Sequence, residues 1–299
     1  ATVLLEEDQT ESVELELVEL AANASANGTV QTAGVGYTGR PFSLYRHGAV
    51  KGNVAVQKSE GYSGLLGKGM SATYPVEVSV PEAATVTDAR LYVYTTWSHD
   101  AGILQGKASS PGVEMDGESL EREAVYSDRK GNGTYDYPVE THCYAPTGIR
   151  PGNRTITFTV TNTGGPEDKF ATYGVVLLLV AEDPDGKEIE YWVGEGSDAV
   201  YANPEFNVDT STAETSIRFP GTLNMTAIAE GELYAISTAA SGSGNRVLFN
   251  GRTRANMLSG GSSGISIARM NVSADVLRSE NIAGIGSVGE ETKGDYMEN

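Results

Sequence analysis

The sequence predicts an all-β protein: two tandem antiparallel β-sandwich domains, jelly-roll-like, preceded by an extended N-terminal arm. Apolar residues alternate with polar ones from Val76 to Val80 and from Ile156 to Val160, which is the period of a strand. Turn signals rich in Gly, Pro and Asn separate these runs, and no convincing amphipathic helix occurs between Tyr37 and Val180. Short strands with such punctuation are typical of sandwiches and jelly rolls.

A repeated pattern predicts two related domains. Residues 90–96 (RLYVYTT) and 232–238 (ELYAIST) are versions of one strand, and each leads through a Gly/Ser loop to a similar segment, at 113–117 and 247–251. The offset between Leu91 and Leu233 is 142 residues, which indicates a duplicated domain and not a solenoid repeat. We expect one domain at residues 36–183 and a second at 184–299, with the boundary in the turn at 182–186.

The second domain is predicted to lack its final strand. The first copy closes with the apolar run 173–181, which reads as a strand buried on both faces. The second copy reaches 294–299 and no such run follows, with truncation by processing as the competing explanation. A sandwich without an interior strand exposes unpaired backbone groups, so we expect another segment to occupy that position.

Residues 1–35 are predicted to form an arm and its linker. Apolar and acidic residues alternate from Ser12 to Leu20, which favours a strand, although the Glu and Leu content also suits a helix. The small residues of 21–32 are typical of a flexible linker. We expect the arm to add a strand to a neighbouring copy through its apolar residues Val13, Leu15, Leu17, Val18 and Leu20.

The composition argues against two classes of partner. The chain has 21 basic and 40 acidic residues, a net charge of −19, whereas nucleic-acid binding is built from clustered Lys and Arg. No stretch approaches the roughly 20 apolar residues that span a bilayer. We therefore predict neither a nucleic-acid partner nor a membrane span.

Several features favour an exported, extracellular protein. The chain begins at Ala1 without Met, as after signal-peptide cleavage, and it contains six Asn-x-Ser/Thr sequons. A single cysteine excludes an internal disulfide framework, so Cys143 is either a buried small hydrophobe or half of an intermolecular disulfide. The candidate N-glycosylation sites are Asn23, Asn27, Asn132, Asn153, Asn224 and Asn271.

No motif indicates an enzyme. Residues 34–39 match G-x-G-x-x-G and residues 260–264 match G-x-S-x-G in letters only, because neither lies between a strand and a helix as the chemistry requires. We predict no catalytic residues and no cofactor. A hydrolase that uses acidic residues on a jelly-roll scaffold ranks last, since no spacing identifies a carboxylate pair.

Two further patterns suggest binding sites. Turn-like loops carry oxygen ligands suited to Ca²⁺, at Asp128, Asn132 and Asp136 and at Asp183 and Asp185, although neither set follows the EF-hand register. Aromatic residues could include a stacking surface for a sugar, although aromatics in strands more often pack in cores or pair across strands. These aromatics are Trp97, Tyr126, Tyr135, Tyr137, Tyr144, Tyr191 and Trp192.

The chain also resembles a known group of proteins. Six segments are similar to uncharacterised extracellular proteins of methanogenic archaea that carry tandem β-sandwich domains. These segments are residues 126–138 (YSDRKGNGTYDYP), 142–144, 173–178, 190–193, 249–251 and 294–297. The resemblance covers roughly residues 40–299. It implies a cell-surface location, with the tubular sheath as first candidate, and no enzymatic activity. In those relatives a short apolar strand follows the Gly-Asp-Tyr-Met segment.

These observations lead to one functional expectation and an alternative. We expect a secreted structural subunit of an archaeal cell-surface assembly (a sheath, surface layer or filament) in which copies polymerise through β-strand addition. The alternative is a carbohydrate-binding or adhesive extracellular module that recognises cell-surface glycans.

Overall fold

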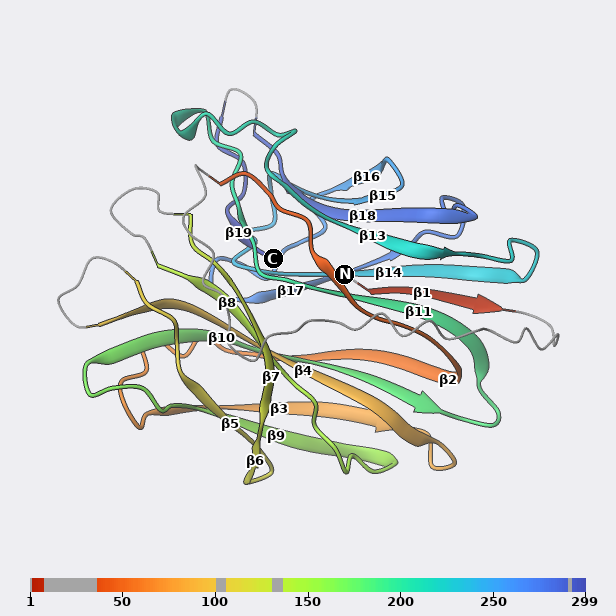
Figure 1. Ribbon diagram of the computed structural model, residues 1–299, viewed down its shortest axis with the longest axis horizontal. Helices are drawn as coiled ribbons and strands as arrows, with labels where there is room; N and C mark the ends of the chain where they lie inside the picture. Colours follow the sequence, from red (N-terminus) through yellow and green to blue (C-terminus); the bar gives the residue numbers. More distant parts are fainter. Residues whose placement is uncertain (1, 8–36, 101–105, 131–136, 290–291) are drawn as a thin grey trace.

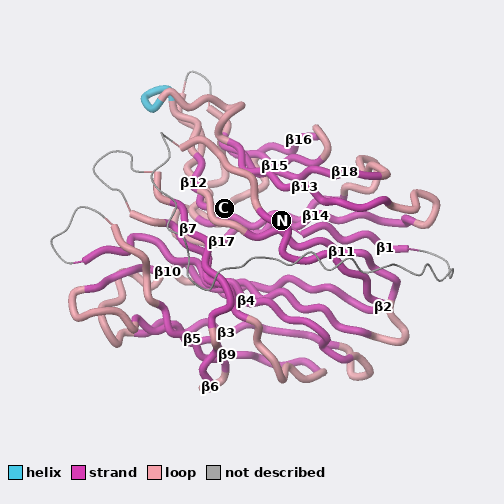
Figure 2. The backbone as a smooth tube through the Cα atoms, viewed as in Figure 1, coloured by secondary structure: helices cyan, strands magenta, loops and turns pink. Residues whose placement is uncertain are grey.

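The computed structural model describes residues 2–7, 37–100, 106–130, 137–289 and 292–299. Within them, the chain forms β-strands and one helical turn of 3-10 type, η1 (Pro204–Phe206), cyan in Figure 2. Every pairing between the named strands is antiparallel. The prediction of an all-β protein built from antiparallel sheets is confirmed.

The first half of the chain contains a four-stranded sheet in the order β3-β9-β5-β6. One face of it packs on a core that includes Val76, Leu91 and Phe158, all fully or almost fully buried. The predicted alternation at 76–80 and 156–160 places these apolar side chains on that face. The strands are β3 (Ser71–Val80), β5 (Pro111–Met115), β6 (Glu118–Leu120) and β9 (Gly152–Asn162).

The second half contains a four-stranded sheet with the corresponding order, β13-β18-β15-β16. Its core includes Phe219, Leu233 and Phe249. In each sheet a two-residue turn joins the last two strands: Asp116 and Gly117 have φ of 50° and 88°, and the matching pair, Asn250 and Gly251, has 46° and 80°. The strands are β13 (Glu214–Thr222), β15 (Asn245–Phe249), β16 (Arg252–Ala255) and β18 (Ser279–Ser287).

A single eleven-stranded sheet runs through both halves. Its order is β12-β19-β14-β1-β11-β2-β10-β4-β8-β7, with β17 also paired to β14. Its strands are β1 (Thr2–Glu7), β2 (Ser43–Glu60), β4 (Thr85–Asp100), β7 (Arg122–Asp128), β8 (Val139–Tyr144), β10 (Asp168–Glu182), β11 (Lys187–Glu195), β12 (Ala199–Val200), β14 (Ile228–Thr238), β17 (Ile265–Asn271) and β19 (Met297–Glu298).

The strands stack in layers (Figure 1). From bottom to top the figure shows β3 and β9, then β2, β4 and β10, then β11, β1 and β14, and finally β13, β15 and β18. A third core lies on the face of the large sheet opposite the other two cores, and it contains residues of both halves, such as Tyr92 of β4 and Ile265 of β17. Strand β10 shows the consequence: Leu177 packs in the first core and Leu178 in the third, as predicted for a strand buried on both faces.

The N-terminal strand β1 occupies an interior position of the large sheet. It pairs along its whole length with β11 on one side and β14 on the other, so that Val3 stands opposite both Trp192 and Leu233. Strand β10 lies in the same way between β2 and β4 in the first half. The position next to β14 for which the sequence predicted a missing strand is therefore filled by Thr2–Glu7.

The alternation of apolar residues predicted a different part of the arm in that position. Its candidates, Val13, Leu15, Leu17, Val18 and Leu20, lie outside the described residues. The short apolar run at residues 3–5 could have indicated β1. The longer alternation of apolar and acidic residues after Ser12 was chosen in its place. Met297 and Glu298 form β19, which pairs with β12 and, at Thr238, with the other edge of β14.

Candidate functional site

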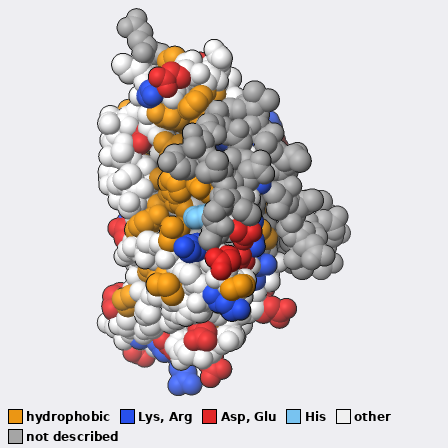
Figure 3. Space-filling model, turned by 90° about the vertical axis from the view of Figure 1, so that its left-hand side faces the viewer, with side chains coloured by type: hydrophobic (Ala, Val, Ile, Leu, Met, Phe, Trp, Pro, Cys, Tyr) orange, Lys and Arg blue, Asp and Glu red, His pale blue; other side chains and the backbone are white. Residues whose placement is uncertain are grey.

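A cavity of about 450 Å³ lies where the two halves meet beside the end of β4. Strands β4, β8 and β10 of the first half contribute to its wall, together with the segments that follow β14 and precede β19 in the second. Figure 3 views this end of the molecule, where hydrophobic side chains gather in a band. Large apolar side chains exposed there include Trp97, at 39 %, and Tyr62, whose ring contacts Tyr173.

Aromatic rings form much of the cavity wall. The Trp97 and Tyr137 rings contact each other with centroids 5.2 Å apart and planes inclined by 43°. Across the cavity the Tyr37 and Tyr296 rings meet edge to face, with centroids 5.7 Å apart. The five aromatic residues of the lining are Tyr37, Trp97, Tyr137, Tyr173 and Tyr296.

The backbone at Trp97 has an unusual conformation. Its φ is 56°, in the left-handed region that bulky residues avoid. The pairing of β4 with β10 shifts at the same place: Thr96 pairs with Ala171 but His99 pairs with Lys169, so β4 carries one extra residue. Such a bulge re-aims a side chain, and here it accompanies the turn of the backbone at Trp97.

The cavity also contains a buried carboxylic acid, Glu298. Its Oε1 accepts hydrogen bonds from the Tyr296 hydroxyl at 3.0 Å and from the Thr96 hydroxyl at 3.2 Å. Burial raises the pKa of the Glu298 carboxyl to about 7, although these hydrogen bonds act in the opposite direction. The group therefore changes its charge near neutral pH.

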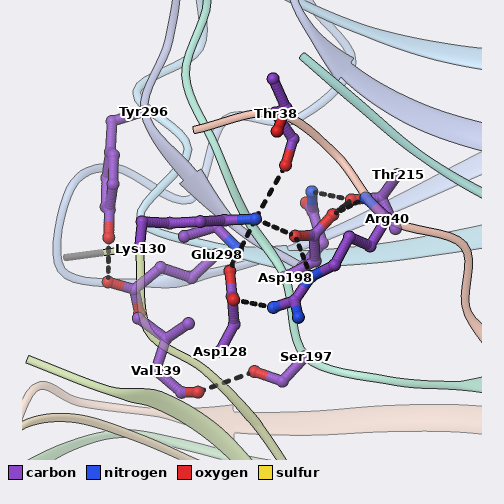
Figure 4. A network of polar contacts seen from close by, with 12 residues as sticks. Thr38, Arg40, Asp128, Lys130, Val139, Ser197, Asp198, Thr215, Tyr296 and Glu298 are labelled. Carbon is purple, nitrogen blue, oxygen red and sulfur yellow. Dashed lines mark hydrogen bonds and ion pairs between the residues drawn. The ribbon is translucent and has the colours of Figure 1, made fainter. Parts of the chain in front are cut away.

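A buried network of charged groups borders the cavity (Figure 4). Lys130 Nζ donates to Asp198 Oδ1 at 2.7 Å and to the Thr38 carbonyl at 2.8 Å, and it lies 3.0 Å from Asp128 Oδ2. Arg40 forms an ion pair with Asp128 and donates its backbone N–H to Asp198. Burial lowers the pKa of Lys130, and the Asp198 charge opposes that shift.

This network joins distant parts of the chain. Asp128 ends β7, whereas Asp198 precedes β12 and exchanges backbone hydrogen bonds with Asn299 in both directions. Asp198 Oδ2 also accepts a hydrogen bond from the Thr215 hydroxyl of β13. Two carboxylates facing two cations satisfy the requirement that buried charges be paired. The network therefore fixes the first half to the second beside the cavity.

A second buried ion pair links the halves on the third core. Arg90 of β4 donates to both carboxylate oxygens of Glu195 at the end of β11, at 2.7 and 2.9 Å. The Tyr92 and Tyr126 hydroxyls donate to the same carboxylate, at 3.0 and 3.1 Å, and the Arg90 guanidinium lies 4.0 Å from the centroid of the Tyr45 ring. This bidentate geometry is the strong form of the contact.

The calcium candidates have other contacts where the structure describes them. Asp128 is held by Arg40 and Lys130, while Asp183 accepts the Asp185 N–H in the turn between β10 and β11. Asn132 and Asp136 lie outside the described residues. Within the described part, no group of three or more His, Cys, Asp or Glu side chains is arranged to hold a metal ion.

The seven candidate stacking aromatics separate into three groups. Tyr144, Tyr191 and Trp192 are buried in the cores, and Tyr126 is half-buried beside Glu195. Trp97 and Tyr137 line the cavity. Tyr135 falls outside the described residues. These groups cannot be told apart from the sequence, because the difference depends on which loops meet beside β4.

Cys143 is fully buried in the third core, and burial raises the pKa of its thiol well above the usual 9.0. The structure therefore shows it packed as a small apolar side chain. An intermolecular disulfide stays a prediction, and it would require the sheet around β8 to open. Of the sequons, Asn153, Asn224 and Asn271 are exposed, whereas Asn23, Asn27 and Asn132 lie outside the described residues.

The comparisons place the chain in one family. Residues 36–299 match the family model described as "Protein of unknown function (DUF3344)". No curated protein and no solved structure matches the chain. The matched range covers both four-stranded sheets and the cavity, and it begins after β1. Within the described residues, no helix has the length and apolar character needed to cross a bilayer.

Proposed function

The chain belongs to the DUF3344 family, and from that premise we propose that it is a secreted structural subunit of an archaeal cell-surface assembly. The subunit consists of two tandem β-sandwiches, residues 36–183 and 184–299, and its copies polymerise into a sheath, surface layer or filament. The polymer grows by β-strand addition, in which β1 of one copy completes the second sandwich of the next.

The observation that carries this proposal is the position of β1. Six residues at the start of the chain form an interior strand, hydrogen-bonded between β11 and β14. The corresponding position in the first half belongs to β10, which continues directly from the rest of its own domain. An interior position filled from a remote segment is the geometry that strand exchange uses.

The length of the connection permits exchange between copies. Residues 8–36 separate β1 from the next described segment, and 29 residues span at most roughly 100 Å when extended. The pairing of β1 with β11 and β14 is the same whether the strand comes from its own chain or from another. Intermolecular exchange therefore sacrifices none of these backbone hydrogen bonds.

Exchange of this kind is directional. The donor strand is at one place on the subunit and the acceptor position at another, so that each copy both gives and receives a strand. A heterologous contact that does not close into a small ring continues as a filament, hoop or sheet. The exposed sequons would then carry glycans on the outer surface of the polymer.

Proline substitutions test the role of β1 through the backbone alone. Val3→Pro together with Leu5→Pro removes two N–H donors from a strand paired on both sides, so we expect assembly to be abolished. The matched control is Val13→Pro together with Leu15→Pro, which leaves the pairing of β1 intact and should assemble normally. Electron microscopy and sedimentation velocity measure both variants.

A complementation experiment identifies the occupant of the position. A chain lacking residues 1–35 should remain unassembled and should bind a labelled peptide of residues 1–7 with one-to-one stoichiometry. A peptide of residues 13–20 should bind at least tenfold more weakly. Assembly of the shortened chain with native morphology would contradict the proposal, and tighter binding of the second peptide would assign the exchange to the other segment.

A further inference from the structure

We propose that the cavity beside β4 is a binding site for a neutral saccharide, with the Trp97 ring as its stacking surface. The inference is independent of strand addition, because the cavity is built entirely from residues 37–298 and includes no part of β1. It assigns to this end of the molecule a ligand that the assembly role does not require.

The cavity has the size and the lining of a small-molecule site. Its volume of about 450 Å³ falls within the roughly 300–1,000 Å³ typical of ligand pockets, which combine apolar walls with a few converging polar groups. Here the walls are the Trp97, Tyr137 and Tyr296 rings, and the polar groups include Glu298, Ser241 and Ser262.

This combination matches the chemistry of a sugar ring. A pyranose presents C–H groups on its faces, which pack on an aromatic plane, and hydroxyl groups around its edge, which need hydrogen-bonding partners. Trp97 is 39 % exposed and its ring contacts the Tyr137 ring, while Ser262 is exposed at the cavity and Glu298 is buried within it. Aromatic and hydrogen-bonding groups therefore line one cavity, as a sugar ring requires.

The duplicated architecture provides an internal comparison for Trp97. The 142-residue offset that relates β4 to β14 places Ala239 at the position equivalent to Trp97. Ala239 has φ of 62°, against 56° for Trp97, and it also lines the cavity. Both halves thus turn the backbone into the left-handed region at the same point.

The fold therefore does not require a large side chain at this point. Alanine satisfies the turn in the second half, where it is 6 % exposed. In the first half the same strained conformation carries a half-exposed indole at the cavity, although bulky residues are disfavoured there. Strained backbone conformations and β-bulges are frequent at binding sites, so both features of β4 at Trp97 support a binding role for its side chain.

Two carboxylates of the lining are already held by contacts within the protein. Asp128 is neutralised by Arg40 and Lys130, and Lys130 itself lines the cavity. Asp295 accepts hydrogen bonds from the Ser241 hydroxyl at 2.6 Å and from the Asn245 amide at 2.9 Å. Binding sites for quaternary ammonium ions combine aromatic rings with nearby carboxylates, and this cavity contains both kinds of group. A tetraalkylammonium is therefore the competing ligand in the test.

Tryptophan fluorescence tests the site directly. The chain has two tryptophans, and Trp192 is 2 % exposed in the second core, so Trp97 is the residue whose emission a ligand in the cavity changes. The full chain is titrated with glucose, galactose, mannose, N-acetylglucosamine, N-acetylgalactosamine and their disaccharides, and with tetramethylammonium chloride. We expect a saturable change with at least one saccharide and none with the ammonium salt.

Variants assign the binding to the cavity. Calorimetry should show affinity for that saccharide reduced at least tenfold by Trp97→Ala, which installs the residue of position 239, and by Tyr137→Ala. Leu277→Ala is the matched control, since Leu277 is exposed to 51 % but does not line the cavity, and it should bind normally. The Val3→Pro, Leu5→Pro chain should also bind normally, which separates this site from assembly.

Three results would overturn the proposal. These are the absence of saturable binding by every saccharide of the panel, saccharide binding that survives both Trp97→Ala and Tyr137→Ala in folded protein, and saturable binding of tetramethylammonium alone. Circular dichroism of each variant establishes that it is folded, and Tyr137→Ala provides the answer if Trp97→Ala does not fold.

Discussion

Buried ionisable residues contribute to the contacts that join the two halves. Asp128, Lys130 and Asp198 tie β7 to the segment before β12, and Arg90 and Glu195 tie β4 to the end of β11. Each group is costly to bury alone and acceptable only because its partner is fixed by another element. These paired charges therefore add fixed contacts between the two halves of the chain.

Glu298 makes stability depend on pH near neutrality. Its folded pKa of about 7 exceeds the unfolded value of 4.5, because burial disfavours the charged form. The folded state therefore binds the proton more tightly, and this stabilisation is complete below pH 4.5 and is lost as pH rises to 7. We expect Glu298→Gln to remove a decline in the free energy of unfolding on the order of 3 kcal/mol between pH 5 and pH 8.

Urea denaturation of both chains across that range measures the effect. The difference between wild type and Glu298→Gln isolates this residue from other carboxyl groups. One such group is Glu140. Its burial opposes ionisation, but hydrogen bonds from His142 and Ser109 lower its pKa. The contribution of Glu140 to the stability of the protein is therefore lost as pH falls. An identical pH dependence in both chains would show that Glu298 does not titrate in this range.

Breaking the Arg90–Glu195 pair should be strongly destabilising. Both side chains are almost completely buried, so Arg90→Met leaves a carboxylate without its cation, and we expect a loss of about 3–5 kcal/mol in the free energy of unfolding. The matched control is Arg218→Met, because Arg218 pairs with Glu280 at the surface and such pairs contribute less than about 1 kcal/mol. Equal losses in urea denaturation would contradict the structural role of the buried pair.

At the scale of an element, the close approach of the β2 backbone determines which residue β10 can have at position 174. Gly174 has φ of 135°, and a Cβ atom there would lie 2.3 Å from the Ser59 carbonyl oxygen of β2. The pairing of β10 with β4 also shifts at this residue. The glycine thus lets β10 fit between two neighbours while bending, which is the structural use of glycine inside a strand.

Alanine substitutions at two glycines separate the cost of a left-handed backbone conformation from the cost of a steric clash with a neighbouring strand. Gly117→Ala, in the turn between β5 and β6, places a Cβ in open space at φ of 88°, and we expect a loss of about 1–2 kcal/mol from the left-handed conformation alone. Gly174→Ala adds an overpacking cost, for a total of roughly 3 kcal/mol or more. Thermal unfolding compares them, and a smaller loss at Gly174 than at Gly117 would refute the close approach.

At the scale of the whole molecule, a net charge of −19 opposes association of identical copies. If assembly proceeds by strand addition, salt should promote it, because ions screen the repulsion while the backbone hydrogen bonds of β1 are unaffected. We expect the assembled fraction in sedimentation velocity to increase from about 10 mM to about 150 mM NaCl, over which the screening length falls from roughly 30 to 8 Å.

An uncharged osmolyte at the same osmolarity serves as the control and should not reproduce the effect of salt. Assembly that weakens steadily as NaCl is raised would show that the contacts between copies are themselves ionic. That result would indicate that the copies associate through their charged surfaces and not through β1.

The sequence by itself determined the all-β architecture, the strands at 76–80, 90–96, 156–160 and 232–238, and the strand of 173–181 buried on both faces. The two hairpin turns, at 116–117 and 250–251, were not predicted, although Asp-Gly and Asn-Gly are residue pairs that favour such turns. These features follow from alternation and turn chemistry, which depend on residues close together in the chain.

Only the tertiary structure decided which distant segments meet. It put Thr2–Glu7 between β11 and β14, paired Arg90 with Glu195, and brought Trp97 and Tyr137 to the same cavity as Glu298. Local patterns specify that a strand forms and which of its faces is apolar, but its neighbour is chosen by backbone pairing and burial over the whole molecule. The proposed assembly and the proposed saccharide site both depend on that choice.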